Sequence, residues 1–202
     1  MDGKDELTVR EHAQWNAAGA AVRGLADRAA SGDLVADDVQ ATFEQLKQIP
    51  LDPDRILNAI HPPKDAGEHA DALLAILNRI HDGWGRWISC DRGWYRLIVE
   101  QDAALAVLCP EYVVHQVREK FGTLRYYAEP CSEHGELWEQ FDALELEVEN
   151  RSAVTCEDCG ATGRLCVKGH WYRTLCDDCI EHRFPAGGGR RYEPVAPRDE
   201  SE

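Results

Sequence analysis

Apolar residues recur at helical spacing through the first eighty residues, which predicts a series of short helices. A first stripe ends at Ser31-Gly32-Asp33, where Gly32 suits a helix C-cap and Asp33 suits the N-cap of the next helix. Asp52-Pro53 begins a later, short helix that His61-Pro62-Pro63 ends. We find no catalytic pattern in this region. The stripes comprise Trp15, Ala18, Val22, Leu25 and Ala29, then Val35, Val39, Phe43 and Leu46, and finally Leu73, Leu77 and Ile80.

The composition changes at His81, after which large aromatic residues and glycines fall close together. Residues 87–108 predict a short strand, a turn and a helix, in that order. Beta-branched and aromatic residues on both sides of Phe121-Gly122 predict a β-hairpin over Tyr112–Tyr127. The next segment, 129–150, holds eight acidic residues and no lysine or arginine. Its apolar stripe predicts an amphipathic helix with an acidic outer face, and comprises Leu137, Phe141, Leu144 and Val148.

These elements together predict an α+β protein in several parts. We expect an N-terminal helical region over residues 1–82 and a small α/β core with the hairpin and the acidic helix over residues 83–150. A zinc-ribbon-like module follows over residues 151–184. The tail, residues 185–202, carries three consecutive glycines and several prolines, and we expect it to be flexible.

Four cysteines in the third part have the spacing of a metal site. Cys156 and Cys159 form one C-x2-C pair, and Cys176 and Cys179 form a second pair after a spacer of 16 residues. This spacing is typical of zinc, because two such knuckles present four thiolates in a tetrahedron. The spacer predicts a hairpin, with strands at 165–167 and 171–175. We therefore expect a structural Zn²⁺ that supplies much of the folding energy of this module.

The acidic residues beside these cysteines weigh against a redox pair, since reactive thiols need positive neighbours. Iron is an alternative metal for four thiolates. Within the spacer, Cys166 and His170 are possible replacement ligands, but the outer four already complete a closed shell with no position for a catalytic water. We expect the basic residues nearby to offset the negative charge of the site. These basic residues are Arg164, Lys168 and Arg173. The remaining cysteines, Cys90, Cys109 and Cys131, have no partner at metal-site spacing, and we expect them to be buried and apolar.

Charge and hydropathy narrow the class of protein. The chain has 202 residues with 37 acidic and 22 basic side chains, a formal net charge of -15. This charge disfavours binding to nucleic acid through general electrostatics. No apolar run approaches the roughly 20 residues of a membrane helix. The first residues are polar and acidic, unlike a secretory signal, and we expect a cytoplasmic location.

Three further features have a functional and a structural interpretation. The predicted hairpin is locally basic, and its arginines and lysine can contact phosphate or simply face solvent, as exposed strand charges do. The acidic helix can bind a basic partner, imitate the charge of DNA, pair with a second copy in a homodimer, or be solvated. Two histidines are candidate general bases without a matched partner. The residues are Arg118, Lys120 and Arg125 in the hairpin, with Arg173 beyond it, and the histidines His115 and His134.

One segment of the chain is distinctive: Gln116-Val117-x-Glu119-Lys120-Phe121-Gly122-x-Leu124-Arg125-Tyr126-Tyr127. It follows Gly83-Trp84-Gly85 and Gly93-Trp94, and precedes Cys156–Gly160 and Thr174–Cys176. Over about residues 83–180 this pattern resembles a family of uncharacterised proteins encoded by bacteriophages and prophages. The resemblance implies a phage origin and action in the host cytoplasm, and it implies no activity and no catalytic residue.

We therefore expect a zinc-binding, non-enzymatic protein that binds or regulates a host component. A nucleic-acid-binding zinc ribbon is the alternative, and a metal-dependent nuclease is a further one. The nuclease needs a second, open metal site and paired histidines, and the cysteine region has neither an Asp-His dipeptide nor a histidine pair.

Overall fold

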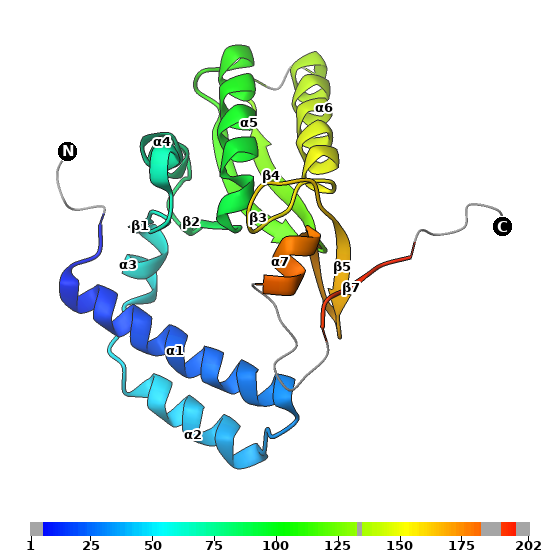
Figure 1. The fold of residues 1–202 in the computed structure, drawn as a ribbon. Coiled ribbons are helices and arrows are strands. Elements are labelled where there is room, and N and C mark those ends of the chain that lie inside the picture. The colour runs from blue at the N-terminus through cyan, green and yellow to red at the C-terminus, as the bar shows by residue number, and fades with distance from the viewer. Residues whose placement is uncertain (1–5, 133–134, 183–190, 197–202) are drawn as a thin grey trace. The chain divides into compact units, whose positions relative to one another are not determined.

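The computed structural model describes residues 6–132, 135–182 and 191–196 (Figure 1). Contacts divide the chain into two units, Met1–Ile60 and His61–Glu202. Helices and strands are mixed, which confirms the α+β class. The finer boundaries predicted after residues 82, 150 and 184 stay predictions. No helix among the described residues is both long and apolar enough to cross a membrane.

The described part of the first unit holds three helices, α1 (Val9–Ser31), α2 (Ala36–Lys47) and α3 (Pro53–Asn58). Gly32 ends α1 in the left-handed conformation, with φ of 80°, as predicted. Asp52 caps α3 by accepting hydrogen bonds from the N–H groups of Asp54 and Arg55, which confirms the predicted start. Asp33 does not cap α2: the N-cap is Val35, whose N–H donates to the carboxylate of Asp38.

Much of the apolar stripe that predicts α1 and α2 is exposed in the structure. The side chains of Trp15, Val22, Val39 and Phe43 are 40% to 55% exposed, whereas Ala18 is buried. Helical periodicity alone therefore predicts these helices correctly without showing which residues form a core.

The second unit contains a four-stranded sheet in the order β1-β2-β3-β4. Strand β2 pairs in parallel with β3, and β3 pairs antiparallel with β4. Phe121 and Gly122, with φ of 55° and 81°, form the two-residue turn of the predicted hairpin. The strands are β1 (Ile60–His61), β2 (Arg86–Ser89), β3 (Val113–Lys120) and β4 (Thr123–Glu129), and the helices of this part are η1 (Gly67–His69), α4 (Ala70–Asn78), η2 (Arg92–Trp94), α5 (Tyr95–Leu108) and α6 (Gly135–Ser152).

The core of this unit lies between the sheet and its helices. In α5, Leu97, Ile98 and Leu105 are buried, whereas Leu108 is 37% exposed. A hydrogen-bonded group runs through the core, where the hydroxyl of Tyr112 bonds to Tyr126 and Asp102, and Arg79 pairs with Asp102 at 3.0 Å. Buried hydroxyls need such partners to offset their desolvation. The fully buried large side chains here are Trp94, Tyr112, Tyr126, Phe141, Leu73, Ile76, Leu77, Ile80, Ile98, Leu105 and Leu124.

Helix α6, predicted from its apolar stripe, covers the outer edge of the sheet. Strand β4 has no neighbouring strand on that side, so its N–H groups need other acceptors. The hydroxyl of Ser152 accepts from Leu124, and the carboxylate of Glu145 accepts from Ala128, both at 2.8 Å. Side chains of α6 thus accept hydrogen bonds from the backbone N–H groups of the edge strand β4, and these bonds fix the helix along the hairpin.

A second sheet, ordered β6-β5-β7, lies beyond α6 in the sequence. Its strands are β5 (Arg164–Lys168), β6 (Trp171–Leu175) and β7 (Glu193–Pro194), and helix α7 covers Asp177–His182. The predicted spacer hairpin is confirmed as β5 and β6. Part of the tail that we expected to be flexible forms β7 on the other side of β5, while residues 183–190 and 197–202 lie outside the described residues.

Two of the cysteines without partner spacing are joined to each other. Cys109, which follows α5, forms a disulfide with Cys131, which follows β4. Cys109 is buried, as expected, but Cys131 is exposed. The prediction of independent apolar cysteines is therefore wrong for this pair, because the fold brings together the ends of two elements that are 22 residues apart in the sequence.

The carboxyl group of Glu145 gives the stability of the protein a pH dependence. Burial raises the pKa of Glu145 to about 7, with the hydrogen bond from Ala128 opposing the rise. Since the folded state holds this proton more tightly than the unfolded chain, stability falls as pH rises from about 4.5 to 7. We expect Glu145→Gln, which keeps the acceptor for Ala128, to reduce this fall in urea unfolding measured across that range.

Glu147→Gln, at an exposed position on the same helix, is the matched control and should leave the fall unchanged. An identical pH dependence in both variants would show that Glu145 is not the group responsible.

The disulfide should stabilise the fold by an amount that grows slowly, as the logarithm, with the length of the loop that it closes. Under oxidising conditions we expect Cys131→Ser to lower the free energy of unfolding by about 3 kcal/mol, for a loop of 22 residues. Under reducing conditions the variant and the parent chain should unfold at the same urea concentration. Cys90→Ser, at a free cysteine, is the control. If reductant leaves the free energy of unfolding of the parent chain unchanged, the result would contradict the Cys109–Cys131 disulfide.

Candidate metal centre

The structure brings together the four cysteines that the sequence predicts as metal ligands. Cys156 and Cys159 lie in the loop between α6 and β5, Cys176 directly follows β6, and Cys179 lies in α7. Their four Sγ atoms all lie within 4.8 Å of one another, and the Sγ atoms of Cys159 and Cys176 are 3.6 Å apart. A tetrahedron with metal–sulfur bonds of about 2.3 Å has sulfur–sulfur distances of about 3.8 Å. The cluster can therefore hold a metal ion.

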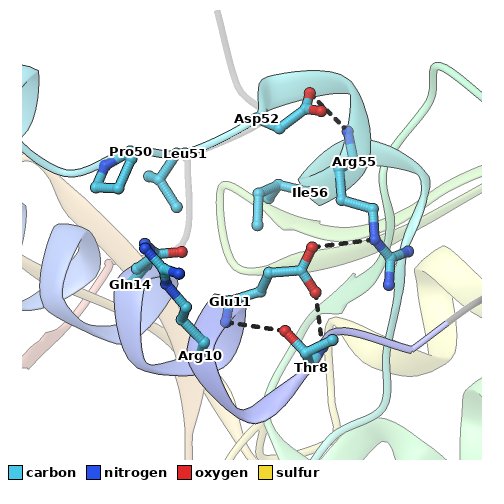
Figure 2. Close-up of a pocket in the computed structure, with 9 residues that line it drawn as sticks. All are labelled: Thr8, Arg10, Glu11, Gln14, Pro50, Leu51, Asp52, Arg55 and Ile56. Carbon is cyan, nitrogen blue, oxygen red and sulfur yellow. Dashed lines mark hydrogen bonds and ion pairs between the residues drawn. The ribbon is translucent and has the colours of Figure 1, made fainter.

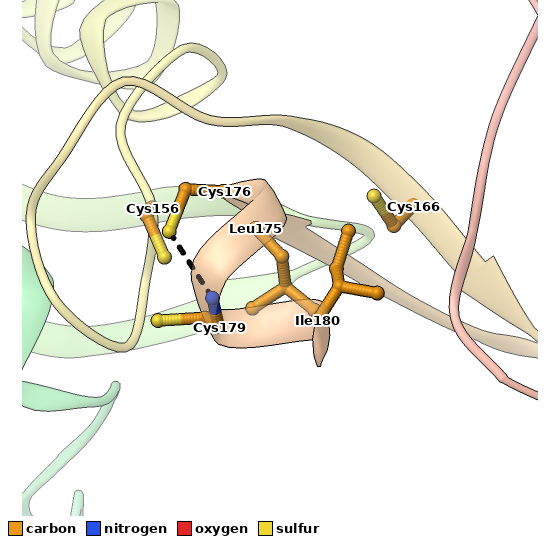
Figure 3. Packing of buried hydrophobic residues seen from close by; sticks show 6 residues of the cluster. All are labelled: Cys156, Cys166, Leu175, Cys176, Cys179 and Ile180. Atoms are coloured by element: carbon orange, nitrogen blue, oxygen red, sulfur yellow. Dashed lines mark hydrogen bonds between the residues drawn. The ribbon is translucent and has the colours of Figure 1, made fainter. Parts of the chain in front are cut away.

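Local backbone structure turns each pair of sulfurs toward the same point. In the first pair, the N–H of Gly160 donates to the carbonyl of Cys156 at 2.8 Å, and Gly160 has φ of 81°, which favours glycine. In the second pair, α7 begins directly after Cys176, and the N–H of Cys179 donates to the sulfur of Cys176 at 3.4 Å (Figure 3). Three of the cysteines are buried and Cys159 is exposed.

The electrostatics of the cluster favour a bound cation. Burial raises the pKa of the Cys179 thiol, and Asp158, whose carboxylate lies 3.1 Å from that sulfur, raises it further. A thiolate beside a buried carboxylate needs a positive charge, which a divalent metal ion supplies. The four cysteines are free rather than disulfide-bonded, which also fits a metal site.

Two of the basic residues expected to offset the charge of the site, Arg164 and Arg173, form ion pairs with carboxylates. Arg164 pairs with Asp177, and Arg173 pairs with both Asp91 and Glu157. Burial raises the pKa of Glu157 to about 7, against the opposing charge of Arg173. These arginines therefore pair directly with acidic residues beside the cysteines, and the charge of Arg164 also interacts with Cys176.

Residues 91–94 pack against the loop that carries Cys156 and Cys159, a contact that the sequence pattern does not predict. Gly93 donates its N–H to the carbonyl of Glu157 at 2.8 Å, and the indole N–H of Trp94 donates to the carbonyl of Thr155 at 2.7 Å. A Cβ on Gly93 would lie 2.3 Å from the carbonyl oxygen of Cys156. No local sequence pattern indicates this role of Gly93 and Trp94, because their partners lie more than sixty positions away in the chain.

The tip of the β3–β4 hairpin packs against the strands of the second sheet. The hydroxyl of Thr174 donates to the carbonyl of Gly122 at 2.6 Å, and a Cβ on Gly122 would lie 2.3 Å from Leu165. The rings of Phe121 and Tyr172 meet edge to face, with 6.2 Å between their centroids. The hairpin and the cysteine module are therefore joined by close contacts.

The remaining candidates lie elsewhere. Cys166 is buried, bonds to the carbonyl of Arg164 and stands apart from the cluster (Figure 3), and His170 is exposed in the turn. His115 bonds to Glu129 at 2.9 Å and packs on Trp84. Cys90 is free and half-buried, and His134 lies outside the described residues. Among the described side chains, the four cysteines form the sole cluster of three or more metal-ligating groups.

The structure divides the basic residues that were candidates for phosphate contact. Arg118 and Lys120 are exposed on the hairpin. Arg125 pairs with Glu149 of α6, and Arg173 is held by its two carboxylates. Half of the predicted cations are thus committed to partners within the fold.

A pocket of about 300 Å³ in the first unit is shown in Figure 2. Its polar groups serve the ends of helices: Thr8 and Glu11 form a capping box at the start of α1, and Asp52 caps α3. Glu11 also pairs with Arg55 at 3.3 Å. The chemistry of this pocket is accounted for by local structure.

Comparisons with protein-family models, curated proteins and solved structures find no match to this chain. The resemblance to phage proteins therefore stays a prediction, and the function is argued from the geometry.

The contact between Gly93 and the first knuckle can be tested directly. We expect Gly93→Ala to lower the free energy of unfolding by about 2 kcal/mol or more, because the new methyl group would meet backbone oxygen atoms. It should also weaken metal retention during titration with a chelator, since it displaces Cys156. Gly135→Ala, where a Cβ meets nothing within 4 Å, is the control. Equal stability and metal retention in the two variants would contradict this role of Gly93.

Proposed function

We propose that the chain is a non-enzymatic protein-binding factor whose contact surface is held in place by a structural Zn²⁺. The supporting observation is an exposed aromatic surface on β6, the strand that leads directly into Cys176, where the ring of Tyr172 meets that of Phe121 at the hairpin tip. This ribbon surface consists of Phe121, Trp171 and Tyr172, which are 65%, 73% and 38% exposed. Exposed aromatic residues on a rigid support are typical of protein interfaces.

Zinc is the metal that this set of ligands fits best. Four thiolates at tetrahedral spacing are typical of structural zinc sites, and such a closed shell leaves no position for a reacting water. Among the described residues, the buried cluster around the cysteines contains only two aliphatic side chains, Leu175 and Ile180. The bound ion would therefore supply much of the folding free energy of this module.

The conformation of Phe121 supports a functional role for this surface. It is the sole non-glycine residue with positive φ in the described part of the chain, and its side chain is mostly exposed. A large residue is costly in this conformation, where asparagine or glycine would be more stable. An aromatic side chain that is 65% exposed in this costly conformation supports a role in binding, beside its contact with Tyr172.

A nucleic-acid-binding ribbon is the second candidate. Lys120, Lys168 and Arg118 are exposed near the aromatic residues, and such surfaces can stack bases and contact phosphates. Against this, the commitment of Arg125 and Arg173 to carboxylates and the net charge of -15 weaken electrostatic attraction. We therefore propose a protein partner, a host component in the bacterial cytoplasm if the phage resemblance holds.

The test combines metal counting with capture of a partner. Native mass spectrometry should give one zinc per chain. Phe121→Asn together with Trp171→Thr removes the two most exposed aromatic side chains of the ribbon surface, with residues that suit a left-handed turn and a strand. We expect this double variant to recover at least about tenfold less of a specific protein from bacterial lysate than the parent chain, by quantitative proteomics.

Phe43→Gln, at an exposed aromatic residue of the first unit, should recover as much as the parent chain. Equal recovery by all three proteins would overturn the proposal. A second metal per chain would favour the nuclease, and a gel shift at low salt that the double variant loses would favour nucleic acid.

A further inference from the structure

Helices α5 and α6 lie side by side (Figure 1), and two adjoining hollows mark their surface. The first has a volume of about 450 Å³ and lies between the two helices, and the second has a volume of about 470 Å³ and follows the end of α6. Ala143 lines both, so the two shallow hollows adjoin at this residue, and we call them together the α5–α6 groove. The first hollow is lined by Ala104, Val107, Leu108, Gln140, Ala143 and Leu144.

The groove exposes apolar side chains that the core does not use. Val107 is 84% exposed, Leu146 is 58% exposed and Val154 is 59% exposed. The core-facing side of the same helices is filled by buried residues such as Leu105 and Phe141. The helices therefore have a second apolar side, which is typical of a surface that another element covers.

The rim of this groove is acidic. Helix α6 carries six acidic residues and one arginine, and that arginine, Arg151, pairs with Glu100 of α5. Within the described part of the chain, Glu136, Glu139 and Glu147 are exposed and form no ion pair. An apolar floor beside unpaired carboxylates matches a ligand with an apolar stripe and positive flanks.

We propose that this α5–α6 groove binds an amphipathic helix of a partner protein, with leucine-like residues on one side and lysine or arginine at its edges. A helix fits because a groove between two packed helices accepts the side chains of a third. The proposal extends the proposed function to a second surface and names the chemistry of its partner.

Charge argues against the two occupants that this chain itself could provide. A second copy would bring two acidic rims together in a protein of net charge -15. Residues 1–60 contain eleven acidic and six basic side chains, so the exposed apolar stripes of α1 and α2 also carry the wrong charge. A basic helix from another protein is the complementary occupant.

Synthetic peptides provide the probe. The test peptide has 18 residues, with leucine at helical spacing on one face and lysine on both flanks, and carries a fluorophore. One control peptide has the same composition in scrambled order, and a second has glutamate in place of lysine. We expect the full chain to bind the test peptide at least about tenfold more tightly than either control, by fluorescence anisotropy.

Variants of the chain locate the binding. Ala143→Arg places a bulky cation in the shared part of the groove and should weaken binding about tenfold, while Ala41→Arg, at an exposed alanine of α2, should not. Glu136→Gln with Glu147→Gln should reduce the salt dependence of binding. Circular dichroism melts should show that all of these variants are folded.

Equal binding of the test and scrambled peptides, or equal loss in Ala143→Arg and Ala41→Arg, would overturn the proposal. A concentration-dependent dimer that Ala143→Arg abolishes would also overturn it, in favour of a second copy. The Phe121→Asn and Trp171→Thr double variant should bind the test peptide normally, so a failure at the ribbon surface is separable from a failure at the groove.

Discussion

The close packing of the first cysteine loop on Gly93 is the constraint on which the second unit depends. No side chain fits between Gly93 and the backbone of Cys156, so the loop that positions two sulfurs is pressed onto the segment that begins α5. The hydrogen bond from Trp94 to Thr155 extends this contact into the core. A metal ion in the cluster would therefore be coupled to the main sheet and not only to its own module.

The same unit uses buried and half-buried ion pairs to arrange its acidic residues. Arg125 fixes α6 to the hairpin through Glu149, and Arg173 joins Asp91 to Glu157 beside the knuckle. Removing one member of such a pair leaves a desolvated charge behind, so these arginines are structural. The acidic rim of the groove comes from the composition of α6, which carries six acidic residues and one arginine.

The cysteines serve two different chemistries. Four of them gather at one point with free sulfurs, while Cys109 and Cys131 form a covalent link between the ends of α5 and β4. Structural disulfides are rare in reducing compartments, whereas thiolate metal sites need reduced sulfur. The redox state of the Cys109–Cys131 pair thus bears directly on the cytoplasmic location that the sequence predicts.

The sequence by itself determined what short-range physics controls. The spacing of Cys156, Cys159, Cys176 and Cys179, the capping by Gly32 and Asp52, and the alternation around Phe121-Gly122 are local patterns, and the structure has each of them. The Cys109–Cys131 link, the exposure of the helical stripes in the first unit and the contact at Gly93 were decided by the tertiary structure alone. These features depend on contacts between segments that are distant in the sequence, and the residue pattern within one segment cannot predict such contacts.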